Sequence, residues 1–292
     1  MRAPLVEEFL LSLRSFLVSL LAVLGAAQAA HAQERPYFVT YDHYLEEPGN
    51  VEIAVANTTG VPRAGHSAYN APWLEVEYGA TGWWTTELYL EGVTAGQDGS
   101  GFAGWRFENR FRLFKSEHRL NPVFYLEYEH VNEASRIQKE IVGSGSLPFE
   151  PIDELRHEYA NELEAKLILS SAIHGWNLAE NVIFEKNLSE SEGIEYGYSV
   201  GVSRSLGGLA SGRTCYVCAE NFALGVEAYG GLGSSMERTL SGTRHFIAPV
   251  LAWHVTPRST LKVSPAFGLT DTSDRYLMRV GFVYELPMRW RR

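Results

Sequence analysis

The sequence predicts an all-β protein: an antiparallel up-and-down transmembrane β-barrel of about twelve strands, in one domain. The first observation is the segment Trp105–Phe114, in which apolar and charged residues alternate along a strand. A strand points successive side chains to opposite faces, so this segment has one apolar and one ionic face. The second is an even number of such segments. The third is that short and long connections between them alternate, although the connection from Gly207 to Asn221 breaks this pattern.

The first residues are typical of a secretory signal peptide. An apolar run, Phe16–Gly25, follows Arg2 and Arg14 and precedes Ala30-His31-Ala32, a small-x-small cleavage pattern. The competing interpretation is an uncleaved anchor, although the run is shorter than the roughly 20 residues of a spanning helix. Residues 1–32 are therefore excluded from the fold.

Composition limits the partners and the number of domains. The 292 residues carry a net charge of -10, with a pI near 5.4, which argues against nucleic acid as a partner. Without the signal peptide, roughly 260 residues remain, which suits a single all-β domain. Aromatic residues make up 12% of the chain and favour strands and membrane interfaces.

We divide the chain after the signal peptide into three parts. Residues 33–50 are an N-terminal extension or partial plug, residues 51–286 form the barrel, and residues 287–292 are a C-terminal tail. The predicted strands are Val51–Asn57, Trp73–Tyr78, Thr85–Gly92, Trp105–Phe114, Val123–His130, Glu162–Ser171, Leu178–Lys186, Glu195–Ser203, Phe222–Gly230, His245–His254, Leu261–Leu269 and Leu277–Leu286.

Two of these strands have no clear assignment of faces. His245–His254 does not separate into apolar and polar positions, and in Leu178–Lys186 the charged Glu180 falls on the same face as Val182 and Phe184. A soluble periplasmic β-sandwich would need a similar alternation and is the alternative fold. The large aromatic residues on the apolar faces favour the barrel.

The charged face is the candidate functional feature, because charges of a membrane barrel collect in its lumen. If neighbouring strands pair in sequence order, arginines lie between glutamates. Such a ladder has a structural interpretation, pairing of buried charges, and a functional one, preference for cations or polar solutes. The predicted lumen residues are Glu75, Glu77, Glu87, Glu91, Arg106, Glu108, Arg110, Arg112, Glu127, Glu129, Glu164 and Lys166.

Cys215 and Cys218 form the only C-x-x-C pattern. The residue after the second cysteine is Ala219 rather than the histidine of a haem-attachment motif, and no further cysteine could complete a zinc site. In an exported chain we expect a small disulfide, with a redox-active pair as the alternative. No metal site and no cofactor are predicted.

Three stretches carry a family resemblance: Glu77–Leu90, Arg106–Leu113 and the C-terminal Ala248–Leu286. They resemble a poorly characterised group of bacterial outer-membrane barrels and, more distantly, the transporter-like barrels of the MetA pathway of phenol degradation. Many barrels of this kind end on an aromatic residue that the insertion machinery recognises, whereas this sequence ends Trp290-Arg291-Arg292.

The resemblance implies residence in the outer membrane and a passive channel or transporter for a small solute. The expected partners are outer-membrane lipid, the barrel-insertion machinery and a small solute. The alternatives are a structural or binding barrel without conduction and an outer-membrane hydrolase. We expect no enzyme, because no serine and histidine motif of an outer-membrane phospholipase is found.

Overall fold

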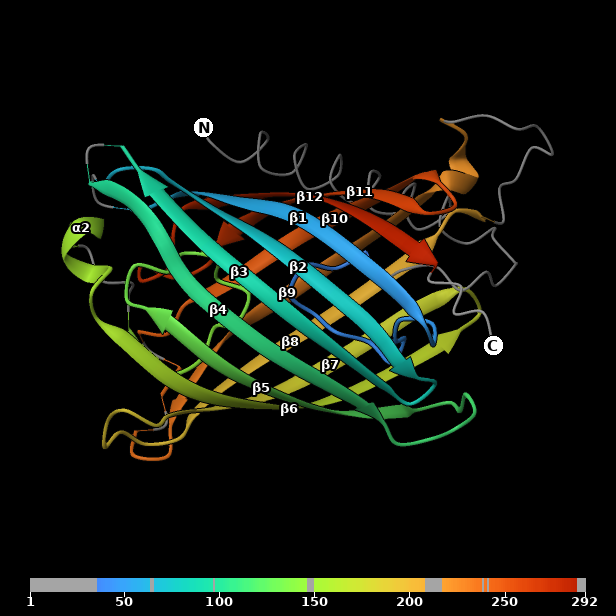
Figure 1. Ribbon diagram of the computed structural model, residues 1–292, viewed down its shortest axis with the longest axis horizontal. Coiled ribbons are helices and arrows are strands. Elements are labelled where there is room, and N and C mark those ends of the chain that lie inside the picture. The colour runs from blue at the N-terminus through green and yellow to red at the C-terminus, as the bar shows by residue number, and fades with distance from the viewer. Residues whose placement is uncertain are drawn as a thin grey trace, which may run out of the picture.

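The computed structural model describes residues 36–63, 66–96, 98–145, 150–207, 217–237, 239–240 and 242–287 as a closed antiparallel β-barrel (Figure 1). Each of its twelve strands pairs with its neighbours in sequence, and β1 pairs with β12 to close the sheet. The strands are β1 Asn50–Val61, β2 Tyr69–Thr81, β3 Trp84–Ala95, β4 Gly99–Arg112, β5 Asn121–Asn132, β6 Tyr159–Ile173, β7 Trp176–Asn187, β8 Glu195–Ser205, β9 Phe222–Ser234, β10 His245–Thr256, β11 Ser259–Gly268 and β12 Tyr276–Pro287.

The predicted fold class is confirmed, and the alternative of a soluble sandwich is wrong because the sheet closes on itself. Each predicted strand matches an observed one, although most observed strands are longer. Strand β4 ends at Arg112, two residues before the predicted end. The backbone N–H of Leu113 still donates to the carbonyl of Pro122, and the chain then turns toward β5.

Side chains alternate between the lumen and the outer surface along each strand. On β3, Glu87 and Glu91 are buried while Leu88 and Leu90 are about two-fifths exposed, at 41% each. The ambiguous β7 follows the same rule, because Glu180 is exposed on the outer face together with Val182 and Phe184. The outer surface is therefore apolar with few charges, as in barrels that span a lipid bilayer.

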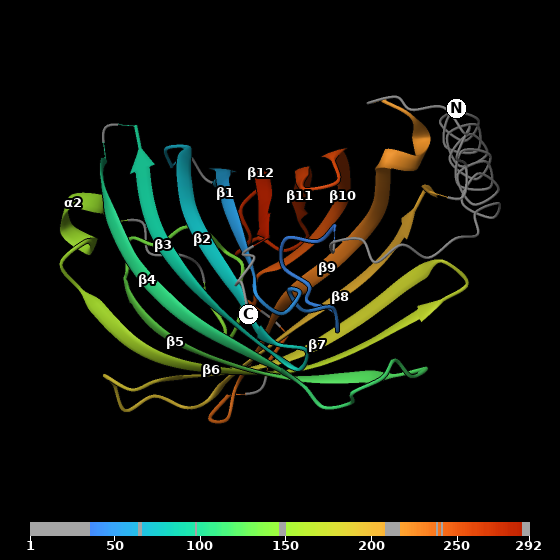
Figure 2. The same ribbon diagram turned by 45° about the vertical axis from the view of Figure 1, so that its right-hand side comes forward.

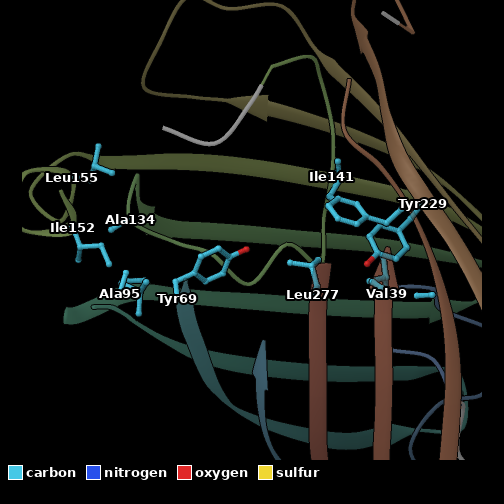
Figure 3. Close-up of a cluster of buried hydrophobic side chains, with 14 residues drawn as sticks. Val39, Tyr69, Ala95, Ala134, Ile141, Ile152, Leu155, Tyr229 and Leu277 are labelled. Atoms are coloured by element: carbon cyan, nitrogen blue, oxygen red, sulfur yellow. The ribbon is translucent and has the colours of Figure 1, made fainter. Parts of the chain in front are cut away.

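Strand β10 lacked a clear alternation because its lumen-facing side chains are apolar. Phe246 and Ala248 are buried in a cluster with Tyr229 and Leu277. Figure 3 shows Tyr229 and Leu277 on the barrel wall beside Val39 and Ile141, which come from segments outside the strands. This part of the lumen is consequently filled by apolar packing.

The two termini of the barrel, Asn50 and Pro287, lie opposite each other at one end. The tight turns after β2, β6 and β10 lie at that same end, which we call the terminal end. The described residues of the connection between β5 and β6, 133–145 and 150–158, begin and end at the other end, the loop end, and include the short helix α2 (Ile152–Leu155) (Figure 2). A 3-10 turn, η2 (Ala219–Asn221), precedes β9.

The predicted signal peptide, residues 1–32, and residues 288–292 of the predicted tail lie outside the described residues. No described helix combines the length and the apolar character needed to cross a membrane.

Candidate functional site: a charged and filled lumen

One row of directly paired residues on the lumen face consists of glutamates. Each of these glutamates lies directly opposite the glutamate of the neighbouring strand. The row begins near the terminal end of β12 and ends at the loop end of β8. Nine residues form this glutamate row: Glu285, Glu52, Glu77, Glu87, Glu108, Glu127, Glu164, Glu185 and Glu195. Like charges directly opposite each other destabilise a sheet, so the row requires counter-charges.

Arg110 supplies counter-charge to three members of the row. Its Nη2 lies 2.5 Å from Glu77 Oε1 and also contacts Glu87, and its Nε lies 3.1 Å from Glu108 Oε1. The side chain is 2% exposed. Directly opposite Arg110 lie Thr85 and Tyr125, so the guanidinium reaches its glutamates diagonally rather than across the ladder.

Arg106 and Lys166 meet at Glu140, which comes from the connection between β5 and β6. Arg106 Nη1 lies 2.7 Å from Glu140 Oε2, and Lys166 Nζ lies 2.9 Å from Glu140 Oε1. Burial alone would raise the pKa of the Glu140 carboxyl, but the two cations outweigh it and lower this pKa to about 2. Glu140 is therefore an anion that joins the connection to the wall.

Residues 36–49 form the N-terminal segment, which is buried inside the barrel over residues 36–43 and reaches solvent at Glu47 and Pro48 (Figure 1). Glu227 accepts backbone N–H groups of this segment, from Val39 at 3.0 Å and from Thr40 at 2.9 Å. Asn181 accepts the N–H of Tyr41 at 2.7 Å and donates to the Tyr41 carbonyl at 2.8 Å. Wall side chains thus replace the strand partner that an extended segment normally has.

Residues 133–145 form the second filling segment, the lumen loop. Lys139 Nζ donates to the hydroxyls of Tyr41 and Tyr89 at 2.9 Å each and lies 4.1 Å from the Tyr89 ring centroid. Those hydroxyls donate in turn to glutamates of the row, Tyr41 to Glu108 at 2.9 Å and Tyr89 to Glu87 at 2.5 Å. The loop therefore adds positive charge to the centre of the row.

Glycines of the wall make room for the lumen loop. A Cβ at Gly197 would lie 2.4 Å from the carbonyl oxygen of Ile141, and a Cβ at Gly231 would lie 2.3 Å from that of Gly143. Val142 pairs with Gly197 in an isolated β-bridge. Any side chain at these positions would displace the loop from the wall.

A cavity of about 270 Å³ remains between the lumen loop and the wall. Its lining is mainly acidic, with two arginines. The charged lining residues are Arg106, Glu129, Glu133, Glu140, Glu162, Glu185, Glu195 and Arg244. Such a cavity attracts cations and repels anions.

Of the twelve predicted lumen residues, Arg112 alone is half-buried, and the structure places the other eleven side chains in the interior. Arg112 lies at the end of β4 and is close enough to His43 to lower the pKa of that imidazole. The sequence did not identify the other participants, because their alignment depends on register and on the filling segments. These residues are Glu52, Lys139, Glu140, Glu185, Glu195, Glu227 and Glu285.

A Ser–His–Glu arrangement also occurs in the lumen. His43 Nδ1 lies 2.5 Å from Ser170 Oγ, and His43 Nε2 lies 3.7 Å from Glu117 Oε1. Burial and the nearby Arg112 lower the pKa of His43 to about 4, so the imidazole is neutral at pH 7. Ser170 is only 1% exposed and also accepts the backbone N–H of His43 at 2.9 Å. In this conformation the serine anchors the N-terminal segment and is closed to a substrate.

The predicted pairing of Cys215 with Cys218 stays a prediction, because Cys215 lies outside the described residues. Cys218 lies between β8 and β9, at the terminal end.

Comparison with known proteins gives structural likeness only. No family model matches the chain, and no curated protein matches its sequence. An outer membrane channel from Pseudomonas putida F1 is 10% identical with a TM-score of 0.54, over 84% of this chain and 98% of that one. The NanC porin is 12% identical with a TM-score of 0.48, over 81% of this chain and all of that one.

Outer membrane phospholipase A from Escherichia coli also matches, at 10% identity and a TM-score of 0.39, over 90% of this chain and 96% of that one. Likeness at these identities concerns the fold alone: this chain has a closed barrel fold similar to that of the Pseudomonas putida F1 channel.

Proposed function

We propose that this protein is an outer-membrane channel for small cations or small polar solutes, and that the described conformation is closed. The observation that carries the proposal is the glutamate row, which lines the lumen from one end to the other. A pore lined by carboxylates favours cations over anions. For a solute to pass, the N-terminal segment or the lumen loop must move out of the lumen.

The outer surface supports residence in a membrane. Outward aromatic rings pair near both ends of the barrel: Trp84 with Phe111 and Phe222 with Trp253 at the terminal end, and Phe267 with Tyr276 at the loop end. Aromatic girdles at two levels with apolar residues between them are typical of bilayer-spanning barrels. Tight turns at the terminal end favour a periplasmic position for that end.

A transport function is in line with the sequence resemblance to the MetA-pathway barrels. For the chain to reach the outer membrane, residues 1–32 must act as a signal peptide. The likeness to the Pseudomonas putida F1 channel supports the fold on which the proposal rests.

The experiment is conductance in planar lipid bilayers under a salt gradient. We compare the wild type with a variant that lacks residues 36–49 and retains the signal peptide. We expect rare channel openings in the wild type and more frequent openings in the variant. In both proteins the reversal potential should show selectivity for cations over anions.

Anion preference would contradict the role of the glutamate row. A correctly folded variant without current would favour a structural or binding barrel. The heat-dependent shift in gel mobility of each protein in detergent shows that the barrel has assembled.

A further inference from the structure

We propose that Glu127, Glu129 and Glu164 form a binding site for one hard divalent cation, of the Ca²⁺ class, in the lumen wall. Three oxygens, one from each carboxylate, lie within 4.8 Å of one another. Ca²⁺ binds oxygens at about 2.3–2.6 Å, so oxygens around one ion lie at such separations. This inference concerns binding and does not depend on conduction.

Unpaired carboxylate oxygens give independent support. Glu129 Oε1 and Glu164 Oε2 are buried and have no hydrogen-bond partner among the described residues. Glu129 is 2% exposed, and Glu164 is fully buried. A buried carboxylate oxygen without a partner is costly, and a bound cation would supply the missing interaction.

Among the described residues, fewer cations than carboxylates make direct contacts around this site. Arg106 contacts Glu91, Glu127, Glu129 and Glu140, and Lys166 contacts Glu140 and Glu164. Two cations thus contact five carboxylates. If all five carboxyls are ionised, three negative charges remain, and a bound divalent cation would compensate two of them.

The ligand chemistry selects the class of ion. The site offers carboxylate oxygens without nitrogen or sulfur, which suits Ca²⁺ and, with more bound water, Mg²⁺. Of the two, we choose Ca²⁺ because its coordination tolerates irregular geometry. Glu129 lines the cavity of about 270 Å³, which gives the ion and its remaining water ligands a place to enter.

Tyr125 provides a direct optical signal. Its hydroxyl donates to Glu127 Oε2 at 2.6 Å, so the ring lies next to the proposed site. Tb³⁺ replaces Ca²⁺ at oxygen sites and luminesces when a nearby tyrosine transfers excitation energy to it. We therefore titrate the full-length mature protein in detergent with Tb³⁺, and then compete with Ca²⁺.

We expect saturable luminescence from one strong site, displaced by Ca²⁺, in the wild type. Glu164→Gln and Glu129→Gln should each weaken Tb³⁺ binding at least tenfold. Glu180→Gln is the matched control, since it also removes one carboxylate but on the outer face, and should bind like the wild type. Each variant is first checked for the heat-dependent gel shift of an assembled barrel.

Ca²⁺ should also raise the unfolding temperature of the wild type, and excess chelator should lower it, because a ligand that binds the folded state stabilises it. This measurement needs no substituted protein. If the buried carboxylates share protons instead, the unfolding temperature will depend on pH and not on Ca²⁺. That result, or equal luminescence of the wild type and Glu164→Gln, would overturn the proposal.

Discussion

The Glu227 carboxylate on β9 accepts the backbone N–H of Thr40 at 2.9 Å, although the two residues are 187 positions apart in the sequence. The same carboxylate oxygen accepts the N–H of Val39 at 3.0 Å. Glu227 therefore holds the N-terminal segment, together with Asn181 and Ser170, and its hydrogen bonds are charge-assisted, which makes them stronger than bonds between neutral groups.

Glu227→Gln should release the N-terminal segment while the barrel stays closed. Loss of the charged acceptor should lower the free energy that holds the segment by about 2 kcal/mol. Limited chymotrypsin digestion in detergent should then cleave after Tyr37 and Tyr41, which are buried in the wild type. Protection equal to that of the wild type, and of the outward Glu180→Gln, would show that Glu227 does not anchor the segment.

Gly197→Ala should loosen the lumen loop. The added Cβ would meet the carbonyl oxygen of Ile141 at 2.4 Å, so the loop must move away from β8. Gly101→Ala is the control, because its Cβ would meet Arg156 at an ordinary 3.7 Å. Hydrogen exchange of residues 139–143 should accelerate in Gly197→Ala alone; similar exchange in both variants would contradict the packing described here.

Arg110→Glu should destabilise the barrel more than Phe111→Leu, its outward neighbour. The substitution removes the counter-charge of Glu77, Glu87 and Glu108 inside a filled lumen, and breaking a buried ion pair costs about 3–5 kcal/mol. Phe111→Leu keeps an apolar outer surface and should cost about 1 kcal/mol. Urea unfolding in detergent measures both. A loss below about 1 kcal/mol for Arg110→Glu would mean that water screens these charges.

The twelve strands and most of their faces could be predicted because alternation is a local property. The two faces of Trp105–Phe114 follow from its own sequence, since successive side chains on a strand point to opposite faces. Exceptions arise where the lumen side is apolar, as at Phe246 and Ala248 on β10. There the two faces of the strand have similar polarity, so the sequence does not indicate which face points into the lumen.

The glutamate row could not be predicted in full, because it depends on register, and a shift of one residue exchanges the two faces of a strand. Sequence order suggested arginines between glutamates, whereas the residue directly opposite Glu108 on each side is another glutamate, Glu87 or Glu127. The positions of the two filling segments, residues 36–49 and 133–145, could not be predicted either, because these segments lie outside the strands and show no alternation. Lumen-facing glycines such as Gly197 were a signal that backbone approaches closely there.

The two cysteines should form a disulfide in the exported protein. Alkylation of the untreated, denatured chain should find no free thiol, and reduction should expose Cys215 and Cys218 together. Replacing both should leave the barrel assembled, because the closed loop is very short and constrains the unfolded chain little. Two reactive thiols in freshly isolated protein would contradict the prediction.

Glu46 should make the stability of the protein depend on pH. Burial, with a contribution from the nearby Glu285 carboxylate, raises the pKa of Glu46 to about 7. Between the ordinary pKa of a glutamate and this value, the folded protein binds a proton that the unfolded chain has lost. Stability from this group is therefore greatest at low pH and falls as the pH rises toward 7.

The measurement is the difference in unfolding temperature between the wild type and Glu46→Gln across pH 4 to 8 in detergent. Subtraction removes the opposite trend from His43, whose lowered pKa costs stability as the pH falls below its ordinary value of 6.5. Relative to the variant, the wild type should lose stability as the pH rises from about 4.5 to 7 and remain constant above that. A difference that does not change with pH would mean that Glu46 keeps an ordinary pKa, so that its carboxylate is hydrated rather than buried against Glu285.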